Sequence, residues 1–266
     1  MNTPERQPAD AIDHPQRGTL YLVPAPLDFG CKNEGDLQQS IPQKTLEVTA
    51  RLQCWICENA KSTRAYLKRV GQLVPLGTTL QSMQLQELPR DVHKKGDHQG
   101  GFDAKYLLQP ALLGEDMGLI SEAGMPAIAD PGSSVVRAAH ELGITVAPLV
   151  GPISLMLALA ASGLNGQNFA FVGYVPSTPA ERAQRVRELE SLALKTGQTQ
   201  LFIETPYRNS ALLQTLLQTL HHHTRLATAS GLTLNQASMH SGVVKQWKDA
   251  AWVLDNAIPT VFAIGR

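Results

Sequence analysis

Short runs of apolar and β-branched residues alternate with longer stretches of helical periodicity along most of the chain. This alternation is typical of α/β units with parallel strands, and it disfavours a β-sandwich or a helical bundle. Strands are predicted over residues 19–23, 53–57, 83–88, 117–121, 144–147, 169–172, 201–204, 225–229 and 260–264. Helices are predicted over residues 42–52, 61–70, 102–113, 133–142, 179–194 and 210–220, with a further helix that ends at Ser162.

The hydrophobic periodicity is lost around residues 163–168, in the sequence GLNGQN, and then resumes. We therefore predict an N-terminal α/β domain over residues 18–163 and a C-terminal α/β domain over residues 164–266. The segment before the first strand is polar and contains proline, with no apolar core. Residues 1–17 are therefore predicted to form a flexible arm and not a signal peptide.

The charges of the chain cancel, because 23 Lys and Arg residues balance 23 Asp and Glu residues. A zero net charge disfavours a protein that grips nucleic acid by bulk positive charge. The balance is uneven along the chain, however, with an acidic excess in residues 1–50 and 111–170 and a basic excess in residues 51–110 and 171–266. The sequence therefore leaves room for a small, local site for an anionic partner.

Three cysteines, Cys31, Cys54 and Cys57, are too few for a disulfide framework, and their odd number fits a reducing compartment such as the cytoplasm. Cys54 and Cys57 lie in one predicted strand, at a spacing that points their side chains to opposite faces. We expect buried structural cysteines there and no metal site. The most apolar run, residues 146–161, contains two prolines and is too short to span a membrane, so no membrane partner is expected.

No two of the 21 glycines are separated by a single residue, so the chain has no Gly-x-Gly motif. The dinucleotide fingerprint and the glycine-rich loop of ordinary Rossmann methyltransferases are therefore absent. A phosphate loop that ends in Gly-Lys-Ser or Gly-Lys-Thr is absent as well. These absences disfavour nucleotide hydrolysis and nicotinamide redox chemistry.

Proline and glycine shape the ends of three predicted strands. The sequence SEAGMPAIADPG, residues 121–132, connects a strand to a helix, while VPAPL at 23–27 and LVGPIS at 149–154 follow two other strands. In open α/β sheets, ligands bind beyond the carboxyl ends of the strands. Gly124 allows a close backbone approach, and the prolines fix the shape of the loops. One such loop also fits a plain rigid turn, but three in one domain predict a ligand pocket.

Several segments together resemble the tetrapyrrole-methylase superfamily, the class III methyltransferases that use S-adenosylmethionine (SAM). The segments are LYLVPAPLDFG, ICENAKSTRAYLKRVG, GLISEAGMPAIADPGSSVVRAAHELGITVAPLVGPIS, FAFVGYVP, LFIETPYR and IPTVFAIG, and they occur in consistent order over residues 18–265. Within the superfamily, the chain is most similar to the ribosomal RNA small-subunit methyltransferase I branch. The resemblance implies two α/β domains, a SAM-binding cleft between them and a homodimer.

The resemblance also implies which residues form the SAM site. The turn after the first strand, the glycine-containing loop, the GPIS turn and two strand ends of the second domain would line it. These positions are Pro24, Pro26, Ala123, Gly124, Met125, Ile128, Ile153, Ser154, Glu204, Pro259 and Thr260. Such loops offer the backbone donors and acceptors that adenine, ribose hydroxyls and an amino-acid group need.

Methyl transfer from SAM is an in-line displacement in which the enzyme mainly positions the reacting groups. A ribose hydroxyl is a poor nucleophile that benefits from a base, and Glu58 is the candidate base, with Arg64 as a second catalytic residue. Lys61, Tyr207 and Arg208 are candidate substrate-binding residues. The alternative is that these charged side chains are solvated surface residues.

Three functions follow from the sequence. The first is a SAM-dependent methyltransferase directed at RNA, of the 16S ribosomal RNA 2′-O-ribose type, with ribosomal RNA or the small ribosomal subunit as partner. The second is a SAM methyltransferase for a small molecule such as a tetrapyrrole. The third is a SAM-binding protein without catalysis, which acts as a sensor or a partner.

Overall fold

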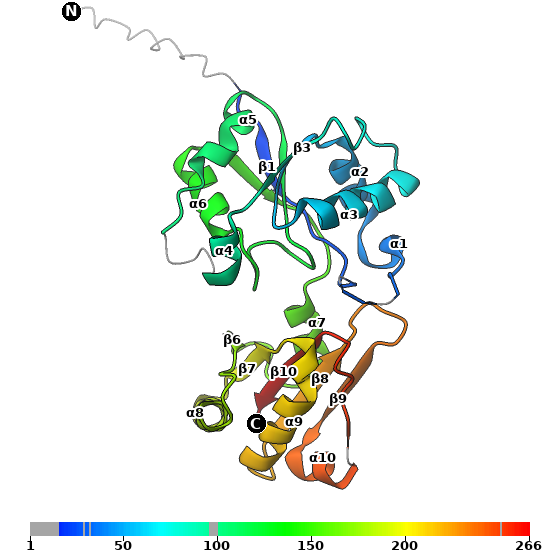
Figure 1. The fold of residues 1–266 in the computed structure, drawn as a ribbon. Coiled ribbons are helices and arrows are strands. Elements are labelled where there is room, and N and C mark those ends of the chain that lie inside the picture. Colours follow the sequence, from blue (N-terminus) through cyan, green and yellow to red (C-terminus); the bar gives the residue numbers. More distant parts are fainter. Residues whose placement is uncertain (1–15, 29, 32, 96–100, 251) are drawn as a thin grey trace, which may run out of the picture.

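The computed structural model describes residues 16–28, 30–31, 33–95, 101–250 and 252–266. The described residues form two α/β units, each built on a five-stranded sheet (Figure 1), which confirms the predicted fold class. Nearly all of the predicted arm lies outside these ranges. Among the helices of the described ranges, none combines the length and apolarity needed to cross a membrane.

The first sheet is wholly parallel and has the strand order β3-β2-β4-β1-β5. Its strands are β1 (Thr19–Leu22), β2 (Cys54–Cys57), β3 (Gln84–Glu87), β4 (Met117–Ile120) and β5 (Thr145–Pro148). The connecting helices are α1 (Leu37–Ser40), α2 (Gln43–Arg51), α3 (Ala60–Leu73), α4 (Arg90–Lys95), the 3-10 turn η1 (Lys105–Leu108), α5 (Gln109–Leu112) and α6 (Ser133–Glu141). Parallel strands require such crossovers.

Both faces of the first sheet are buried, as a parallel sheet requires. Cys57 packs in one core cluster with residues of α2 and α3, whereas Cys54 packs in another with residues of α5 and α6. The two side chains therefore point to opposite faces, as predicted, and both thiols are free and buried. Burial raises the pKa of the Cys57 thiol to about 11, which keeps it in its unreactive protonated form at neutral pH.

The second sheet has the strand order β6-β7-β10-β8-β9 and is mixed. Its strands are β6 (Phe169–Tyr174), β7 (Thr199–Ile203), β8 (Arg225–Ser230), β9 (Ser238–Val243) and β10 (Thr260–Gly265). Only β6 and β7 pair in parallel, whereas β10 is antiparallel to β7 and β8, and β8 is antiparallel to β9. The expectation of parallel strands throughout is therefore wrong for this half. The short connection from β8 to β9 cannot hold the crossover that a parallel pair needs.

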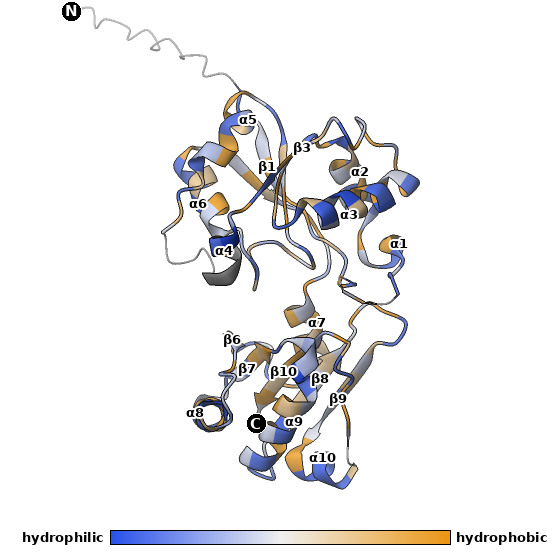
Figure 2. Cartoon of the chain, in the orientation of Figure 1, coloured by the Kyte–Doolittle hydropathy of each residue, from blue (hydrophilic) through white to orange (hydrophobic). Residues whose placement is uncertain are grey.

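Helices α8 (Pro179–Thr196), α9 (Asn209–Thr219) and α10 (Val244–Ala250), with the 3-10 turn η2 (Pro206–Arg208), belong to the second unit. Residues of α8, α9 and α10 share one core cluster with Phe202 and Phe262, whose rings stack at 5.8 Å between centroids. Figure 2 shows hydrophobic residues along the strands of this sheet and hydrophilic residues over much of α3 in the first unit. Each helix thus buries its hydrophobic face in the core and leaves its polar face in contact with solvent.

Helix α7 (Ser154–Ser162) lies between the two units in the chain and packs against the second sheet. Leu155, Ala158 and Leu159 are buried in one cluster with residues of β7, β8 and β10. This packing supports a division of the chain at residues 149–153, ahead of α7, and we propose that division in place of the predicted boundary after Gly163.

Some elements differ from the sequence prediction. Helix α3 continues through Gly71 to Leu73, and the helix predicted over 102–113 is reduced to η1 and the single turn α5. Helix α6 begins at Ser133, as predicted, and is preceded by Gly132 at φ 137°. Strand β9 and helices α1, α4 and α10 were not predicted, because they are short and β9 is mostly polar.

Candidate functional site

The three loops shaped by proline and glycine meet at the carboxyl ends of the first sheet. Ala25 and Gly124 form an isolated antiparallel bridge, in which each backbone N–H donates to the other's carbonyl oxygen at 2.8 and 3.0 Å. Gly151 lies against the ring of Pro24, so closely that a Cβ atom there would be 2.2 Å from the proline Cγ. The buried Tyr66 hydroxyl donates to the Pro24 carbonyl oxygen at 3.3 Å. These contacts therefore hold the three loops in fixed positions relative to one another.

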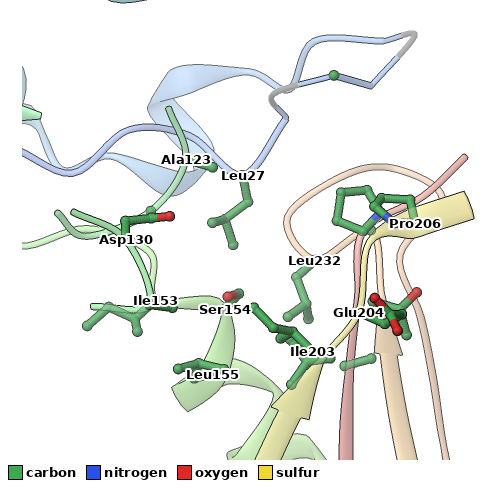
Figure 3. Close-up of a pocket in the computed structure, with 18 of the residues that line it drawn as sticks. Leu27, Ala123, Asp130, Ile153, Ser154, Leu155, Ile203, Glu204, Pro206 and Leu232 are labelled. Carbon is green, nitrogen blue, oxygen red and sulfur yellow. The ribbon is translucent and has the colours of Figure 1, made fainter. Parts of the chain in front are cut away.

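A cavity of about 420 Å³ opens between these loops and the second unit (Figure 3). This volume is within the roughly 300–1,000 Å³ of small-molecule sites. The first unit contributes Leu27, Gly30, Ala123, Gly124, Met125, Ile128, Ala129 and Asp130, and the start of α7 contributes Ile153, Ser154 and Leu155. The second unit contributes Tyr174, Ile203, Glu204, Thr205, Pro206, Ala229, Gly231, Leu232, Ala257, Pro259, Thr260 and Val261.

Nine of the eleven residues predicted to bind the cofactor line this cavity. They are Ala123, Gly124, Met125, Ile128, Ile153, Ser154, Glu204, Pro259 and Thr260. The other two lie behind it. Pro24 packs against Gly151, and Pro26 lines a smaller neighbouring cavity of about 200 Å³. Both prolines thus shape the loop from behind, while the backbone N–H and carbonyl groups of Gly124 form hydrogen bonds with Ala25.

The carboxylate of Glu204 is fully buried at the end of β7 and has two unequal oxygens. Its Oε1 atom accepts from the Arg208 Nη2 group at 2.6 Å and from the Thr205 backbone N–H at 2.7 Å. Its Oε2 atom is buried without a hydrogen-bond partner among the described residues. A buried acceptor without a partner is costly unless a ligand satisfies it. Glu204 therefore marks the polar anchor of the cavity.

Asp130 projects its carboxyl group into the cavity from the glycine-containing loop (Figure 3). Burial, together with the negative charges of Glu58 and Glu122, raises the pKa of this carboxyl to about 7, although a hydrogen bond with Ser121 acts in the opposite direction. The residue before it, Ala129, has the left-handed φ of 65°. Such conformations are uncommon outside glycine and cluster at functional sites.

Tyr174 faces this loop from the last position of β6, next to an irregularity in the pairing of β6 with β7. Burial and the negative charges of Asp130, Glu204 and Glu58 raise the pKa of its hydroxyl group, so it is a protonated donor at neutral pH. Strand irregularities near active sites often redirect a side chain. The cavity therefore has one acidic group from each unit and a phenol that interacts electrostatically with both.

The predicted catalytic and substrate-binding residues lie around the cavity without lining it. Glu58 follows β2, and its Oε2 atom accepts from the Glu122 backbone N–H at 3.2 Å, so it holds the glycine-containing loop. Lys61 and Arg64 are exposed on the first turns of α3. Tyr207 is 68% exposed on η2.

Arg208 is half-buried through its ion pair with Glu204, and its guanidinium group lies 5.3 Å from the ring centroid of Tyr207. The Glu204 carboxylate raises the pKa of this guanidinium, which is charged in any case. Sequence reasoning placed Arg208 on the substrate. In the structure, its guanidinium group also binds the Glu204 carboxylate and lies over the Tyr207 ring, and the substrate role stays a prediction.

Sequence reasoning missed several lining residues, above all Asp130 and Tyr174. Asp130 lies inside the glycine-containing loop of residues 121–132. The prolines and glycines form the recognisable pattern of this loop, and the charge of Asp130 is not part of that pattern. Tyr174 ends the FAFVGY strand, but nothing in the sequence indicates that β6 comes next to the first unit. The remaining missed positions are mostly small or apolar residues in loops or at the ends of elements, which carry no distinctive signal: Leu27, Gly30, Ala129, Leu155, Ile203, Thr205, Pro206, Ala229, Gly231, Leu232, Ala257 and Val261.

The lining fits SAM, the group that the sequence implies. The walls are mostly apolar, which suits the adenine ring and the carbon chain, and the polar groups are few and convergent. The unpartnered Glu204 Oε2 atom offers an acceptor to a hydroxyl or amino group. Within the described ranges, no cluster of three or more His, Cys, Asp and Glu residues is arranged to hold a metal ion.

Comparisons with known proteins bear on the family and the fold of the chain. No family model matches the chain. The chain is 32% identical over 214 residues to the ribosomal RNA small subunit methyltransferase I of Xylella fastidiosa, which covers 80% of this chain and 67% of that protein. It is 30% identical over 214 residues to the protein of the same name from Vibrio cholerae, which covers 80% of this chain and 65% of that protein. The solved structure of uroporphyrin-III C-methyltransferase from Thermus thermophilus matches 94% of each chain with a TM-score of 0.53 and 18% identity, which shows a shared fold.

Proposed function

Because this chain belongs to the ribosomal RNA small subunit methyltransferase I family, we propose that it transfers a methyl group from SAM to RNA of the small ribosomal subunit. The observation that carries the proposal is the 32% identity to a curated relative over 80% of the chain. The cavity between the two units supports it, since nine residues implied by the family resemblance line one continuous surface. A 2′-hydroxyl of a ribose is the proposed acceptor.

The chain's own residues have mainly to bind and position the reactants. When SAM is bound, its sulfonium carries an activated methyl group, so alignment supplies much of the rate enhancement. Glu204 would hold SAM through its unpartnered Oε2 atom, and Ile153, Leu155 and Leu232 would exclude water around it. We propose that Glu58 acts as a positioning residue through the loop that it holds, and we retain Arg64 as a proposed catalytic residue.

The polynucleotide would approach across both units. Lys61 and Arg64 are exposed on α3 of the first unit, and Tyr207 and Arg208 lie on η2 of the second. Cationic side chains bind phosphates, and an exposed aromatic ring stacks on bases that lie outside a duplex. This distribution supports a local contact with RNA and is compatible with the zero net charge of the chain.

Two measurements test the proposal. Calorimetry with SAM should give a dissociation constant in the micromolar range, and the chain should transfer labelled methyl groups from SAM into small ribosomal subunits from a strain that lacks this protein. Transfer of methyl groups into uroporphyrin-type tetrapyrroles but not into subunits would show that the acceptor is a small molecule. SAM binding with no transfer to either acceptor would indicate a SAM-binding protein without catalysis. A chain that does not bind SAM would contradict all three functions that follow from the sequence.

We further propose that the chain forms a homodimer and works in the cytoplasm. The resemblance to the tetrapyrrole methylases supports the dimer, and light scattering after gel filtration measures it. A ribosomal substrate and the small, odd number of cysteines, three, support the location. Fractionation of cells with an antibody against the chain would test it.

A further inference from the structure

Asp130 is a titratable group of the cavity to which neither the sequence motif nor the relatives' names give a role. Its carboxyl group points into the space between the two units and is not engaged in an ion pair in the described part of the chain (Figure 3). Glu204, the other lining carboxylate, is held by Arg208 and Thr205. Asp130 is thus the lining carboxylate that can exchange a proton with a ligand.

We propose that Asp130 is the general base that accepts the proton of the acceptor hydroxyl, and that Glu58 is a positioning residue that acts through it. This inference rests on the proposed function. In the step, the hydroxyl oxygen forms a bond to the methyl carbon as the bond from that carbon to sulfur breaks. The sulfur keeps the bonding electron pair and becomes a neutral thioether, and the hydroxyl proton passes to the Asp130 carboxylate.

The surroundings of Asp130 suit this role. Glu58 approaches from the segment after β2, Glu122 lies in the same loop, and Tyr174 faces it from β6. The two neighbouring carboxylates and burial favour the protonated form, and together they bring the pKa to about 7. A base is most effective when its pKa lies near the working pH. An ordinary exposed aspartate, with a pKa near 4, would be too weak a base.

Glu58, the base expected from the sequence, is less well placed for that role. One of its carboxylate oxygens accepts from the Glu122 backbone N–H at 3.2 Å, and Glu58 does not line the cavity. Its negative charge acts on Asp130 and on Tyr174. Glu58 therefore tunes the proton affinity of Asp130 while it holds the loop that carries this residue.

The test compares Asp130→Asn with the wild-type chain, using SAM calorimetry and single-turnover transfer into small ribosomal subunits. We expect Asp130→Asn to bind SAM with unchanged affinity and to transfer the methyl group about 100-fold to 10,000-fold more slowly. Asp249→Asn, an exposed charge on α10, is the matched control and should change neither value. A transfer rate within a few-fold of wild type, or a loss of SAM binding in Asp130→Asn, would overturn the assignment.

The pH profile gives a second readout that does not depend on that variant's stability. The wild-type rate should rise about tenfold from pH 6 to pH 8, as a group with a pKa of about 7 loses its proton. Glu58→Gln removes a like charge, so the rise should move to lower pH, and the rate at pH 6 should approach that at pH 8. An unmoved profile would overturn the role of Glu58. Failure of the wild-type chain itself to bind SAM or methylate subunits would instead refute the proposed function.

Discussion

At the scale of single residues, Glu204 has the most constrained surroundings in the cavity. Its side chain is fully buried, and its pairing with Arg208 uses one oxygen. The second oxygen stays without a partner among the described residues. A protein carries such a group at a cost in stability, so its retention next to a cavity indicates that a ligand completes the hydrogen bonding.

Replacing Glu204 by Gln keeps the size of the side chain and removes its charge. We expect the dissociation constant for SAM to rise at least about tenfold, because loss of a hydrogen bond to a charged group costs about 1.5–3 kcal/mol. Calorimetry measures the change. Glu181→Gln, an exposed residue in the first turn of α8, serves as the control. An unchanged affinity in Glu204→Gln would mean that Glu204 serves only to hold Arg208.

Sequence reasoning found residues that line the cavity where a continuous motif carries them, as with Ala123, Gly124, Met125 and Ile128. It could not find Tyr174, because the position of β6 beside the first unit depends on tertiary packing. It also could not rank Asp130 above Glu58. That ranking depends on burial and on the direction of each side chain, which are properties of the folded loops.

At the scale of elements, the contact between Gly151 and Pro24 joins two of the loops that carry the site. The backbone of Gly151 needs no left-handed conformation, and the reason for glycine is the lack of space for a side chain. The loop of residues 149–153 leads directly into α7, whose first residues line the cavity. A displacement at Gly151 would therefore move Ser154 and Leu155.

Substituting Gly151 by Ala tests this coupling. The new Cβ atom would lie 2.2 Å from the Pro24 ring, so the two loops must separate. We expect a loss of about 1–3 kcal/mol in the free energy of unfolding, as overpacking costs, together with weaker SAM binding. Urea denaturation and calorimetry measure the two effects. Gly166→Ala has open space around the new atom and should leave both values near wild type; equal behaviour of the two variants would contradict the coupling.

The elements of the first unit could be predicted from sequence more fully than those of the second. Buried parallel strands such as CWIC and MGLI are continuous apolar runs with clear loop signals at their ends. Strand β9, by contrast, reads SMHSGV and lies at the edge of its sheet, where little of it is buried. Pairing with β8 stabilises it, and that pairing has no local signature.

At the scale of the whole molecule, the described chain crosses once from the first sheet to the second, through residues 149–153 and α7. The walls of the cavity come from both units, so a bound ligand adds contacts between them. Noncovalent contacts therefore hold the two units in their relative orientation on either side of this single connection.

SAM should accordingly stabilise the whole chain against heat. At about 100 times its dissociation constant, a ligand that binds only the folded state adds about 2.7 kcal/mol. For a chain of this size we expect a rise in Tm of about 5–10 °C. Differential scanning calorimetry measures it, with Glu204→Gln at the same SAM concentration as the control. A Tm that does not respond to SAM would contradict a site between the units.

The position of β10 bears on the order in which the protein is made. This strand follows the other four of its sheet in the sequence, yet it lies in the middle of them, between β7 and β8. Domains generally fold as units during synthesis, with the N-terminal one first. The first unit has all its strands before β6 is translated, whereas the second sheet stays split until residues 260–265 leave the ribosome. A nascent chain therefore cannot close the cavity prematurely, and the proposed methyl transfer would begin only after translation has passed β10.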